Sequence, residues 1–304
     1  MIADSTTALK YVKLSGREDL RYFPDFLIVG PQRTGTTWLH ANLRYHPQIM
    51  LSEPKELYFF SSLKAPGRQR CPSNELEWYL QFFREPLRRV LLRNAISLWR
   101  YRTLYRPQVR GEATASYAAI DRDVIEEITA LKPAIKVILM IRDPIERAWS
   151  HAKKDLVRNR SRKFADVTAS EFEQFFADPY QRRCARYVEN IDNWSACLLP
   201  GHLLVALFDD IDSRPEALLL EVMSFLGVAA ERRYLGRGAG EAVNPTGASK
   251  IPERYRRFLE ALLKDDLAEL EARLGLSWSA AGTLVRRRDL ATAERGFVLA
   301  LDRR

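Results

Sequence analysis

The segment 30–37, GPQRTGTT, has the composition of a turn that binds an anion. It follows a short apolar run and precedes a stretch of helical periodicity, so its backbone N–H groups would point at a ligand from the start of a helix. Gly35 permits close approach of the backbone, and Arg33 and the hydroxyls of Thr34, Thr36 and Thr37 can donate hydrogen bonds. An ordinary strand-to-helix turn, in which Thr36 or Thr37 caps the helix, is the structural alternative.

The spacing of the two glycines limits which anion this loop could hold. Four residues separate Gly30 from Gly35, as in P-loops that bind nucleoside triphosphates, but Thr36 stands where such loops carry a lysine. In those enzymes the lysine reaches the β- and γ-phosphates. Its absence argues against a γ-phosphate and leaves a smaller terminal anionic group. A kinase or other NTPase would also need the run 203–208 and the following Asp209-Asp210 to hold Mg²⁺.

A second candidate anion site follows another apolar run, 137–141. Arg142 stands at the end of this run, and Pro144 is a favoured first residue for the helix that we expect next. Ser150 comes about two helical turns later, so Arg142 and Ser150 could converge on one phosphate if the helix folds back over the strand end. Alternatively, Arg142 pairs locally with Asp143 or Glu146, and Ser150 is a surface residue.

These loops need elements to position them, and the periodicity predicts an α/β fold. We expect strands at 26–29, 137–141 and 203–208, with a weaker one at 109–113. Helical patterns lie between them, and such alternation indicates a largely parallel sheet flanked by helices, with ligands beyond the carboxyl ends of the strands. We expect helices at 36–46, 122–131, 144–157, 182–198 and 214–226, and a long amphipathic helix at 254–274 that ends at Gly275.

Composition places limits on the class of protein. The 304 residues are 46% hydrophobic and 29% charged, which suits one folded domain over 1–304 rather than a disordered chain. Cys71, Cys184 and Cys197 have no disulfide or zinc spacing, which fits a reducing compartment. The longest uncharged window, 193–208, contains Pro200-Gly201 and is too short for a membrane span. We therefore expect a cytoplasmic location.

Two segments together carry a family resemblance. GPQRTGTTWL (30–39) and IRDPIERAWSH (141–151), in this order, resemble sulfotransferases that use 3′-phosphoadenosine-5′-phosphosulfate (PAPS). The likeness covers most of the chain: 186–211 is similar to a helix–strand segment of the family, SFLGV (224–228) to its FLG motif, and 254–278 to its C-terminal helix. In motif the chain is most similar to bacterial and heparan sulfate-type members. The resemblance implies a three-layer, P-loop-like α/β fold with a mostly parallel central sheet.

The resemblance also implies how the donor would bind. Arg33, Thr34, Gly35, Thr36 and Thr37 would hold the 5′-phosphosulfate, and Arg142 with Ser150 would hold the 3′-phosphate. A loosely matching segment, 244–250, implies donor contacts for Gly247 and Lys250. The product would be adenosine 3′,5′-bisphosphate (PAP). This assignment agrees with the residues, because two separate phosphate groups need two anion sites and a donor without a γ-phosphate needs neither a P-loop lysine nor a metal.

The segment 52–60, SEPKELYFF, is similar to the KE…FF segment of the heparan sulfate-type enzymes, where the glutamate is the catalytic base. The resemblance therefore makes Glu56 the leading base for deprotonating a hydroxyl or amine acceptor, a role that typically contributes ~10²–10⁴-fold. Lys55 and Arg33 could neutralise the charge that grows on the departing phosphate oxygen. The alternative is that Lys55-Glu56 is a solvated charge pair.

The chain departs from the family at one charged position. Where the family has a lysine after a glutamate, this chain has Ala113 after Glu112. Either another cation replaces the lysine, such as an arginine of 84–110, or the acceptor is not a glycosaminoglycan. Glu112 could be a second acidic group or a structural carboxylate. Among the histidines, His151 ranks first as a rival base but below Glu56.

Net charge and arginine content bear on partners. Basic residues exceed acidic ones by 9, and arginine outnumbers lysine 37 to 11. The segment 64–108 is a candidate lobe or lid, and 84–110 contains eight arginines with interleaved apolar residues. A basic amphipathic helix there could dock an anionic acceptor, a membrane surface or another subunit, or could be a solvated face. No nucleic-acid-binding signature is present, so no nucleic acid is expected.

The sequence thus favours a sulfotransferase that transfers a sulfuryl group in line to a hydroxyl or amine. The acceptor stays open between a small molecule or natural product, a glycan and a lipid, because acceptor pockets carry no motif. Two other classes stay open: the NTPase above, and a protein that binds anionic lipid or nucleic acid without catalysis.

Overall fold

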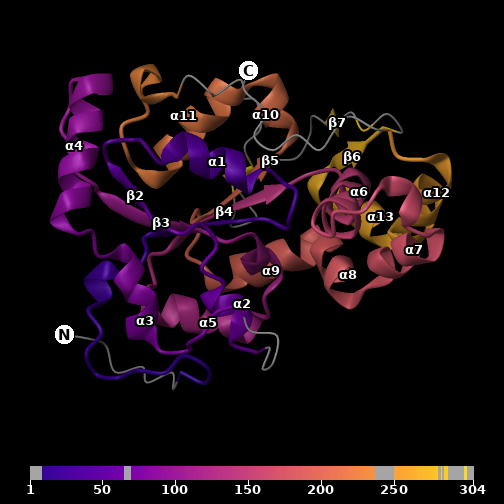
Figure 1. Cartoon of the computed structure of the whole chain (residues 1–304), viewed down its shortest axis with the longest axis horizontal. Helices are drawn as coiled ribbons and strands as arrows, with labels where there is room; N and C mark the ends of the chain where they lie inside the picture. Colours follow the sequence, from indigo (N-terminus) through magenta and orange to yellow (C-terminus); the bar gives the residue numbers. More distant parts are fainter. Residues whose placement is uncertain are drawn as a thin grey trace.

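A six-stranded parallel sheet runs through the centre of the molecule (Figure 1). The computed structural model describes residues 9–64, 70–236, 250–279, 282, 284–286 and 298–299. The strands follow one another across the sheet in the order β2 (Ile49–Leu51), β3 (Val109–Ala113), β1 (Phe26–Val29), β4 (Lys136–Ile141), β5 (Leu203–Leu207) and β8 (Val298–Leu299). The four expected strands are confirmed, and the short strands β2 and β8 are additional.

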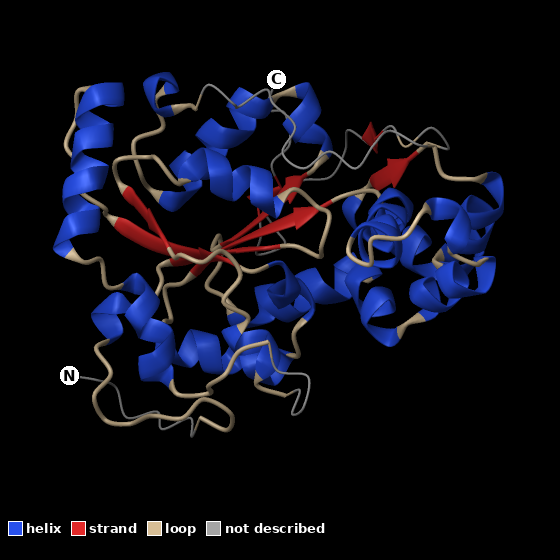
Figure 2. Cartoon of the chain, viewed as in Figure 1, coloured by secondary structure: helices blue, strands red, loops and turns tan. Residues whose placement is uncertain are grey.

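Helices cover both faces of the sheet, so the expected three-layer α/β fold is confirmed (Figure 2). Successive side chains of a strand point to opposite faces. Phe26 and Ile28 of β1 accordingly belong to one core with α1 and α11, whereas Leu27 and Val29 belong to another with α5 and α9. These helices span Thr36–Leu43 (α1), Pro215–Leu226 (α11), Arg122–Leu131 (α5) and Tyr187–Cys197 (α9).

A third helical group lies at one end of the molecule, beside the carboxyl ends of the strands (Figure 1). It has an apolar core of its own, built around Trp149, Phe172 and Leu259. Its helices are α6 (Pro144–Ala152), α7 (Ala169–Ala177), α8 (Pro179–Ala185) and α12 (Glu253–Leu262), and α13 (Lys264–Leu274) continues from α12. After α6 the chain forms a π-helical segment, η4 (Lys153–Arg158), before it leaves the helix.

The remaining elements are short or peripheral. Among them are helices α2 (Phe59–Ser62), α3 (Leu76–Leu80), α4 (Leu87–Tyr101) and α10 (Asp209–Ser213), and the antiparallel strands β6 (Leu276–Trp278) and β7 (Leu284–Arg286). Single turns of 3₁₀-helix span Leu20–Tyr22, Gln81–Phe83, Ala115–Ala119 (η3), Phe164–Asp166 and Arg232–Tyr234. No helix in the described part of the chain is long and apolar enough to cross a membrane.

Two expected helices are each divided into two. The span 182–198 contains the end of α8 and then α9, and 254–274 contains α12 and then α13. Both breaks lie where the chain passes from one core to another: Leu259 belongs to the third helical group, but Leu270 packs with α9 beneath the sheet. A straight helix could not reach both cores. Gly275 ends α13 with a positive φ of 62°, as expected.

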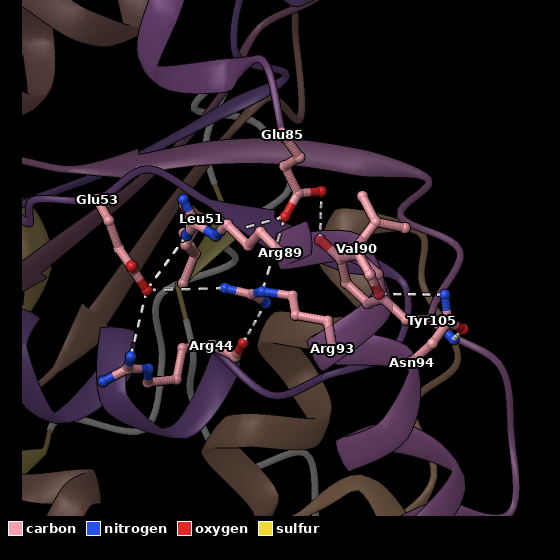
Figure 3. Close-up of polar contacts among 9 residues, drawn as sticks. All are labelled: Arg44, Leu51, Glu53, Glu85, Arg89, Val90, Arg93, Asn94 and Tyr105. Carbon is pink, nitrogen blue, oxygen red and sulfur yellow. Dashed lines mark hydrogen bonds and ion pairs between the residues drawn. The ribbon is translucent and has the colours of Figure 1, made fainter. Parts of the chain in front are cut away.

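The helix expected in the arginine-rich segment is α4, but its faces are arranged in the opposite way to those of a solvated basic helix. Arg89 and Arg93 face the protein, where they pair with Glu53 and Glu85 (Figure 3). The apolar side chains point to solvent, and Trp99 is 78% exposed. The expectation of a basic outer face on this helix is therefore wrong for its two central arginines, because carboxylates from other segments draw them inward.

Asp143 fixes the start of α6, the helix that carries Ser150. Its buried carboxylate accepts hydrogen bonds from the backbone N–H groups of Ile145 (2.8 Å) and Glu146 (3.4 Å). These groups have no partner within the helix, so a side-chain acceptor at this position stabilises the helix start. Burial raises the pKa of Asp143 to about 6, which still leaves the carboxylate mostly ionised at neutral pH.

We predict that Asp143→Ala lowers the free energy of unfolding by about 1–2 kcal/mol, because it removes this cap. Asp143→Asn keeps an acceptor oxygen and should unfold within about 1 kcal/mol of the wild type. Urea unfolding at pH 7 would compare the three proteins. Equal destabilisation by Asn and Ala would contradict a capping role.

Candidate functional site

The loop between β1 and α1 turns sharply at two glycines that could not carry a side chain. A Cβ at Gly30 would lie 2.7 Å from the carbonyl oxygen of Met140 in β4, and one at Gly35 would lie 2.4 Å from Ile211. Gly35 also has a positive φ of 95°. The loop is thereby pressed against the carboxyl edge of the sheet, with the start of α1 facing the same edge.

Arg33 and Arg142, from two separate loops, are joined at this edge together with Ser150. Arg33 Nε donates a hydrogen bond to Ser150 Oγ at 2.9 Å, and Arg142 Nη1 donates to the Arg33 carbonyl at 3.4 Å. The Arg142 guanidinium also lies over the ring of Phe208, 4.3 Å from its centroid. Ser150, which the sequence paired with Arg142, is therefore bonded to Arg33, and Arg142 contacts the main chain of the same loop. A local partner for Arg142 exists too, since Glu146 lies 3.9 Å away, although Arg256 approaches Glu146 more closely at 3.1 Å.

Positive charge accumulates around this junction. Burial lowers the pKa of Arg33, and the charges of Arg158 and Arg142 lower it further. Burial likewise lowers the pKa of Lys153, with Arg142 and Arg33 adding to the effect. Four cations thus act on one another at the strand edge, which favours a ligand that brings negative charge.

Lys153 and Arg158 were not predicted as site residues. They belong to the π-helical segment that extends α6, three and eight positions after Ser150. A signal was available in the sequence, because residues three or four positions apart share one face of a helix. The widened turn of a π-helix, a feature often found at functional sites, was not readable there.

The remaining predicted donor residues occupy different settings. Thr34 is fully buried, and its hydroxyl donates to the Pro31 carbonyl at 2.9 Å within the loop. Thr36 is buried and Thr37 half-buried in the first turn of α1. Lys250 is exposed just before Ile251, which packs into the core of the third helical group beside α6. Gly247 lies outside the described residues.

Glu56 stands on a strained backbone next to the sheet edge. Its φ is 68°, and its N–H donates to the Ala113 carbonyl at the end of β3 at 3.0 Å. Lys55 Nζ contacts one carboxylate oxygen at 2.8 Å, and Tyr58 Oη donates to the other. Burial alone would raise the pKa of Glu56, but the charge of Lys55 and these hydrogen bonds lower it overall. The carboxylate is therefore ionised at neutral pH and able to accept a proton.

The cation that the family has after Glu112 has a candidate replacement. Besides Lys55, the charge of Lys154 in the π-helical segment lowers the pKa of Glu56. Lys154 therefore links Glu56 electrostatically to the segment that carries the anion-site cations. By contrast, Arg89 and Arg93, two of the arginines considered for this replacement, are paired with carboxylates at α4.

Glu112 is a buried carboxylate that is hydrogen-bonded next to the Glu56 segment. Its side chain is fully buried and accepts hydrogen bonds from the hydroxyls of Tyr79 and Thr114. The backbone N–H of Leu57, the neighbour of Glu56, also bonds to it. Burial raises the pKa of Glu112 to about 6 despite these hydrogen bonds. Of the two roles left open by the sequence, the geometry favours the structural one.

His151 and His46 have hydrogen-bond partners within the protein. His151 is buried, with Nδ1 3.1 Å from Gln181 Oε1 and Nε2 3.3 Å from Asp155 Oδ2, and burial lowers its pKa. His46 forms a turn, accepting from the backbone of Gln48. Burial and the charges of Lys55 and Arg44 lower the pKa of His40 to about 4, so this ring is neutral.

A pocket of about 380 Å³ opens between the loop and the Glu56 segment. Gln32 of the loop and Tyr58, which holds Glu56, both line it. The remainder of the wall comes from α2, η3, α5 and α8, with the cations Lys64, Arg70 and Arg183 and the acid Asp121. Asp121 is paired with Lys64 at 2.8 Å and with Arg183 at 3.0 Å, and Lys64 also contacts Asp123 at 3.0 Å, so the three cations of the wall meet two acids.

The two acids that a metal-dependent NTPase would need are held by protein groups. Asp210 is fully buried and forms an ion pair with Arg214 at 2.8 Å. Asp209 accepts from the indole N–H of Trp278 at 3.2 Å. Within the described ranges, no cluster of three metal-ligating side chains occurs.

Comparison with known proteins decides the family. A model described as "Sulfotransferase family" matches residues 24–232, which include the loop, Glu56, Arg142 and Ser150. The chain belongs to the sulfotransferase family. A crystal structure of a sulfotransferase from Alicyclobacillus acidocaldarius shares the fold, with a TM-score of 0.60 at 21% identity over 90% of this chain and 99% of that one.

Curated relatives of this sulfotransferase are larger proteins. It is 28% identical over 289 residues to the mouse bifunctional heparan sulfate N-deacetylase/N-sulfotransferase 4, a match of 84% of this chain and 30% of that protein. It is also 28% identical over 225 residues to human enzyme 2 of the same name, covering 69% of this chain and 23% of the relative. The chain thus spans less than a third of the length of these relatives.

The buried Glu112 generates a pH prediction. Its pKa rises from an ordinary value near 4.5 to about 6 in the folded protein. The folded state therefore binds this proton more tightly than the unfolded state, so the contribution of Glu112 to stability is present below pH 4.5 and is lost as pH rises through 6. Through Glu112, the wild type should lose about 2 kcal/mol of its free energy of unfolding as pH rises through this window. Glu112→Gln should not show this loss.

Chemical denaturation between pH 4 and pH 7 would measure this difference. Glu126→Gln, at an exposed position on α5, is the matched control and should follow the wild-type pH dependence. If the curves of Glu112→Gln and the wild type run parallel, Glu112 does not titrate as the structure implies.

Proposed function

We propose that this sulfotransferase transfers a sulfuryl group from PAPS to a hydroxyl or amine of an acceptor. The observation that carries the proposal is the junction of Arg33, Ser150 and Arg142, where two anion-binding segments meet at one strand edge. A donor with a 5′-phosphosulfate and a separate 3′-phosphate has the charge that this junction lacks. The family membership of the chain supports the same donor.

The residues divide between the two ends of the donor. The loop backbone at Gly35, the start of α1 and Arg33 would hold the 5′-phosphosulfate, with Thr36 and Thr37 in the first helical turn. Arg142 and Ser150 would hold the 3′-phosphate, and Lys153 and Arg158 add positive charge nearby. Lys250 and Gly247 remain proposed contacts from the segment that precedes α12. No residue in this set needs a metal for binding.

Glu56 is the proposed base. As the acceptor oxygen or nitrogen attacks sulfur, the bond from sulfur to the phosphate oxygen breaks and the acceptor's proton passes to Glu56. Lys55, 2.8 Å from the Glu56 carboxylate, would offset the negative charge that develops on the leaving phosphate. For the proton transfer, the acceptor must replace Tyr58 or Lys55 as the hydrogen-bond partner of this carboxylate.

The pocket beside Tyr58 is the proposed acceptor site. Its wall includes Ser61, Ser116 and the two tyrosines Tyr58 and Tyr180. Their hydroxyls donate hydrogen bonds within the protein, and their oxygen lone pairs can accept hydrogen bonds from a polyhydroxylated molecule. Lys64, Arg70 and Arg183 outnumber the two acids that they meet and favour an acceptor with negative charge. An acidic glycan combines both properties, which is why we rank it above an uncharged lipid or natural product. The relatives named for heparan sulfate are consistent with this ranking.

We predict selective stabilisation by PAP, the product of the proposed donor. At a concentration a hundred times its Kd, PAP should add about 2.7 kcal/mol and raise the unfolding midpoint by several degrees. Arg142→Ala should weaken PAP binding by roughly 10–100-fold, because it removes a charged hydrogen-bond donor from the 3′-phosphate. Thermal unfolding with PAP, with AMP and with ATP plus Mg²⁺ would measure this.

The control variant for this experiment is Arg257→Ala, which removes an exposed arginine of α12 paired only locally with Glu253. It should respond to PAP like the wild type. Stabilisation by ATP with Mg²⁺ but not by PAP would reject the proposed donor and favour an NTPase.

The proposed base generates a separate prediction. Glu56→Gln should lower kcat by ~10²–10⁴-fold, because the amide cannot accept the acceptor's proton. Its affinity for PAP should be nearly unchanged, whereas Arg33→Ala should lower both affinity and turnover. Release of PAP from PAPS, with a panel of acidic glycans and phenols as acceptors, would give kcat, and Glu126→Gln serves as the control. Loss of PAP binding in Glu56→Gln would overturn the assignment of Glu56 as base.

A further inference from the structure

The outer side of α4 is apolar and exposed. Leu87, Leu91, Leu92, Leu98 and Trp99, which we call the α4 face, have exposed fractions between 44% and 78%. At 100° per residue these five positions fall within about 140° of the helix circumference, an arc that also contains Ala95 and Arg88. Single exposed leucines are common on protein surfaces, but a contiguous set on one helix marks an interaction site.

The inner side of α4 explains why the apolar side chains point outward. Arg89 Nη2 lies 3.2 Å from Glu53 Oε1, and Arg89 and Arg93 each approach Glu85 at 3.7 Å (Figure 3). Tyr105 Oη donates to the same Glu85 at 2.7 Å.

This network also reaches the main chain. Arg93 Nη1 donates to the Arg44 carbonyl at 2.7 Å, and Arg89 Nη2 donates to the Leu51 carbonyl at the end of the edge strand β2. Rotating α4 to bury its leucines would break all of these contacts and leave Glu85 without its cations. The orientation of the helix is therefore fixed by its polar side.

The charges around the α4 face identify its partner. Between Pro86 and Gln108 the chain has six arginines and no acidic residue. Arg89 and Arg93 are held inward, but Arg88 within the arc is exposed, as are Arg102 and Arg106 just after the helix. A second copy docked on this face would bring arginines against arginines with no acid to pair them. An anionic surface with an apolar interior matches both properties.

We propose that α4 docks this protein on the surface of an anionic lipid bilayer. The leucines and Trp99 would enter the boundary between headgroups and acyl chains, where tryptophan is favoured. Arg88, Arg102 and Arg106 would contact the lipid phosphates, with their aliphatic stems along the apolar arc. This docking does not depend on the proposed donor or acceptor.

The position of α4 is compatible with catalysis at a membrane. In Figure 1, α4 lies at one side of the molecule and α6, which carries Ser150, at the other, so the junction of Arg33 and Ser150 lies away from α4. A protein attached through α4 would leave this edge open to water-soluble ligands. The inference thus concerns where the enzyme works and not how it reacts.

Vesicle binding tests the proposal. The full chain would be sedimented with vesicles of phosphatidylcholine alone and with vesicles in which about a third of the lipid is anionic phosphatidylglycerol. We expect binding to the anionic vesicles that weakens at least tenfold in Leu91→Ser/Trp99→Ser. Because both side chains are exposed, this variant should keep the wild-type unfolding midpoint and PAP response. Arg88→Ala/Arg102→Ala should weaken binding and flatten its salt dependence.

The matched control is Leu199→Ser, which removes an exposed leucine, 48% exposed, between α9 and β5. It should bind vesicles like the wild type. No binding to anionic vesicles, or equal loss in Leu199→Ser and the α4 variant, would overturn the proposal. Sedimentation velocity without lipid gives the other decisive result: a dimer abolished by Leu91→Ser/Trp99→Ser would assign the face to a second copy of the chain.

Discussion

The pairing of β1 with β4 is the constraint on which the site depends. The register joins Val29 at the end of β1 to Leu139, so β4 continues beyond β1 before it reaches Arg142. The chain leaving β1 must therefore turn against the backbone of β4, and the 2.7 Å that separates a Cβ at position 30 from the Met140 carbonyl admits only glycine. This tight turn places Arg33 beside Arg142 and beside Ser150 of α6. Two segments more than a hundred residues apart in sequence thereby meet at one edge of the sheet.

The same geometry concentrates like charges around Arg33 and Lys153. Burial and the charges of neighbouring cations lower the pKa of both Arg33 and Lys153. The folded chain therefore holds these side chains where their charged forms are disfavoured. Core packing supplies the opposing force, because Trp149 on α6 is buried against Phe172 and Tyr255. The donor that we propose would relieve this repulsion, because it brings negative charge to the cations.

The sequence predicted the parts of this arrangement that depend on local patterns. Strands buried on both faces appear as apolar runs, so β1, β4 and β5 were visible, whereas β2 has only three residues. The helix breaks after α8 and α12 were not visible, because both halves of each span have helical periodicity and only the change of core separates them. The roles of Lys153 and Lys154 depend on charges from distant segments, which no local pattern contains. The prediction of Glu56 as the base came from the resemblance to a family, since Lys55-Glu56 alone is an ordinary charge pair.

Helix α4 shows how periodicity fixes amphipathicity without fixing orientation. Its pattern of leucines and arginines is equally consistent with either side facing the protein. The choice is made chiefly by the nearly buried carboxylate of Glu85, which requires cations, and the more exposed Glu53 adds a second carboxylate on that side of the helix. Once Arg89 and Arg93 satisfy them, the leucines can only face outward. A core helix would reverse this arrangement at little cost, since replacing the carboxylates and arginines by apolar residues is often neutral or stabilising. The ion pairs on the inner side of α4 therefore leave its apolar side chains exposed. Packing within the monomer does not account for this exposed apolar surface.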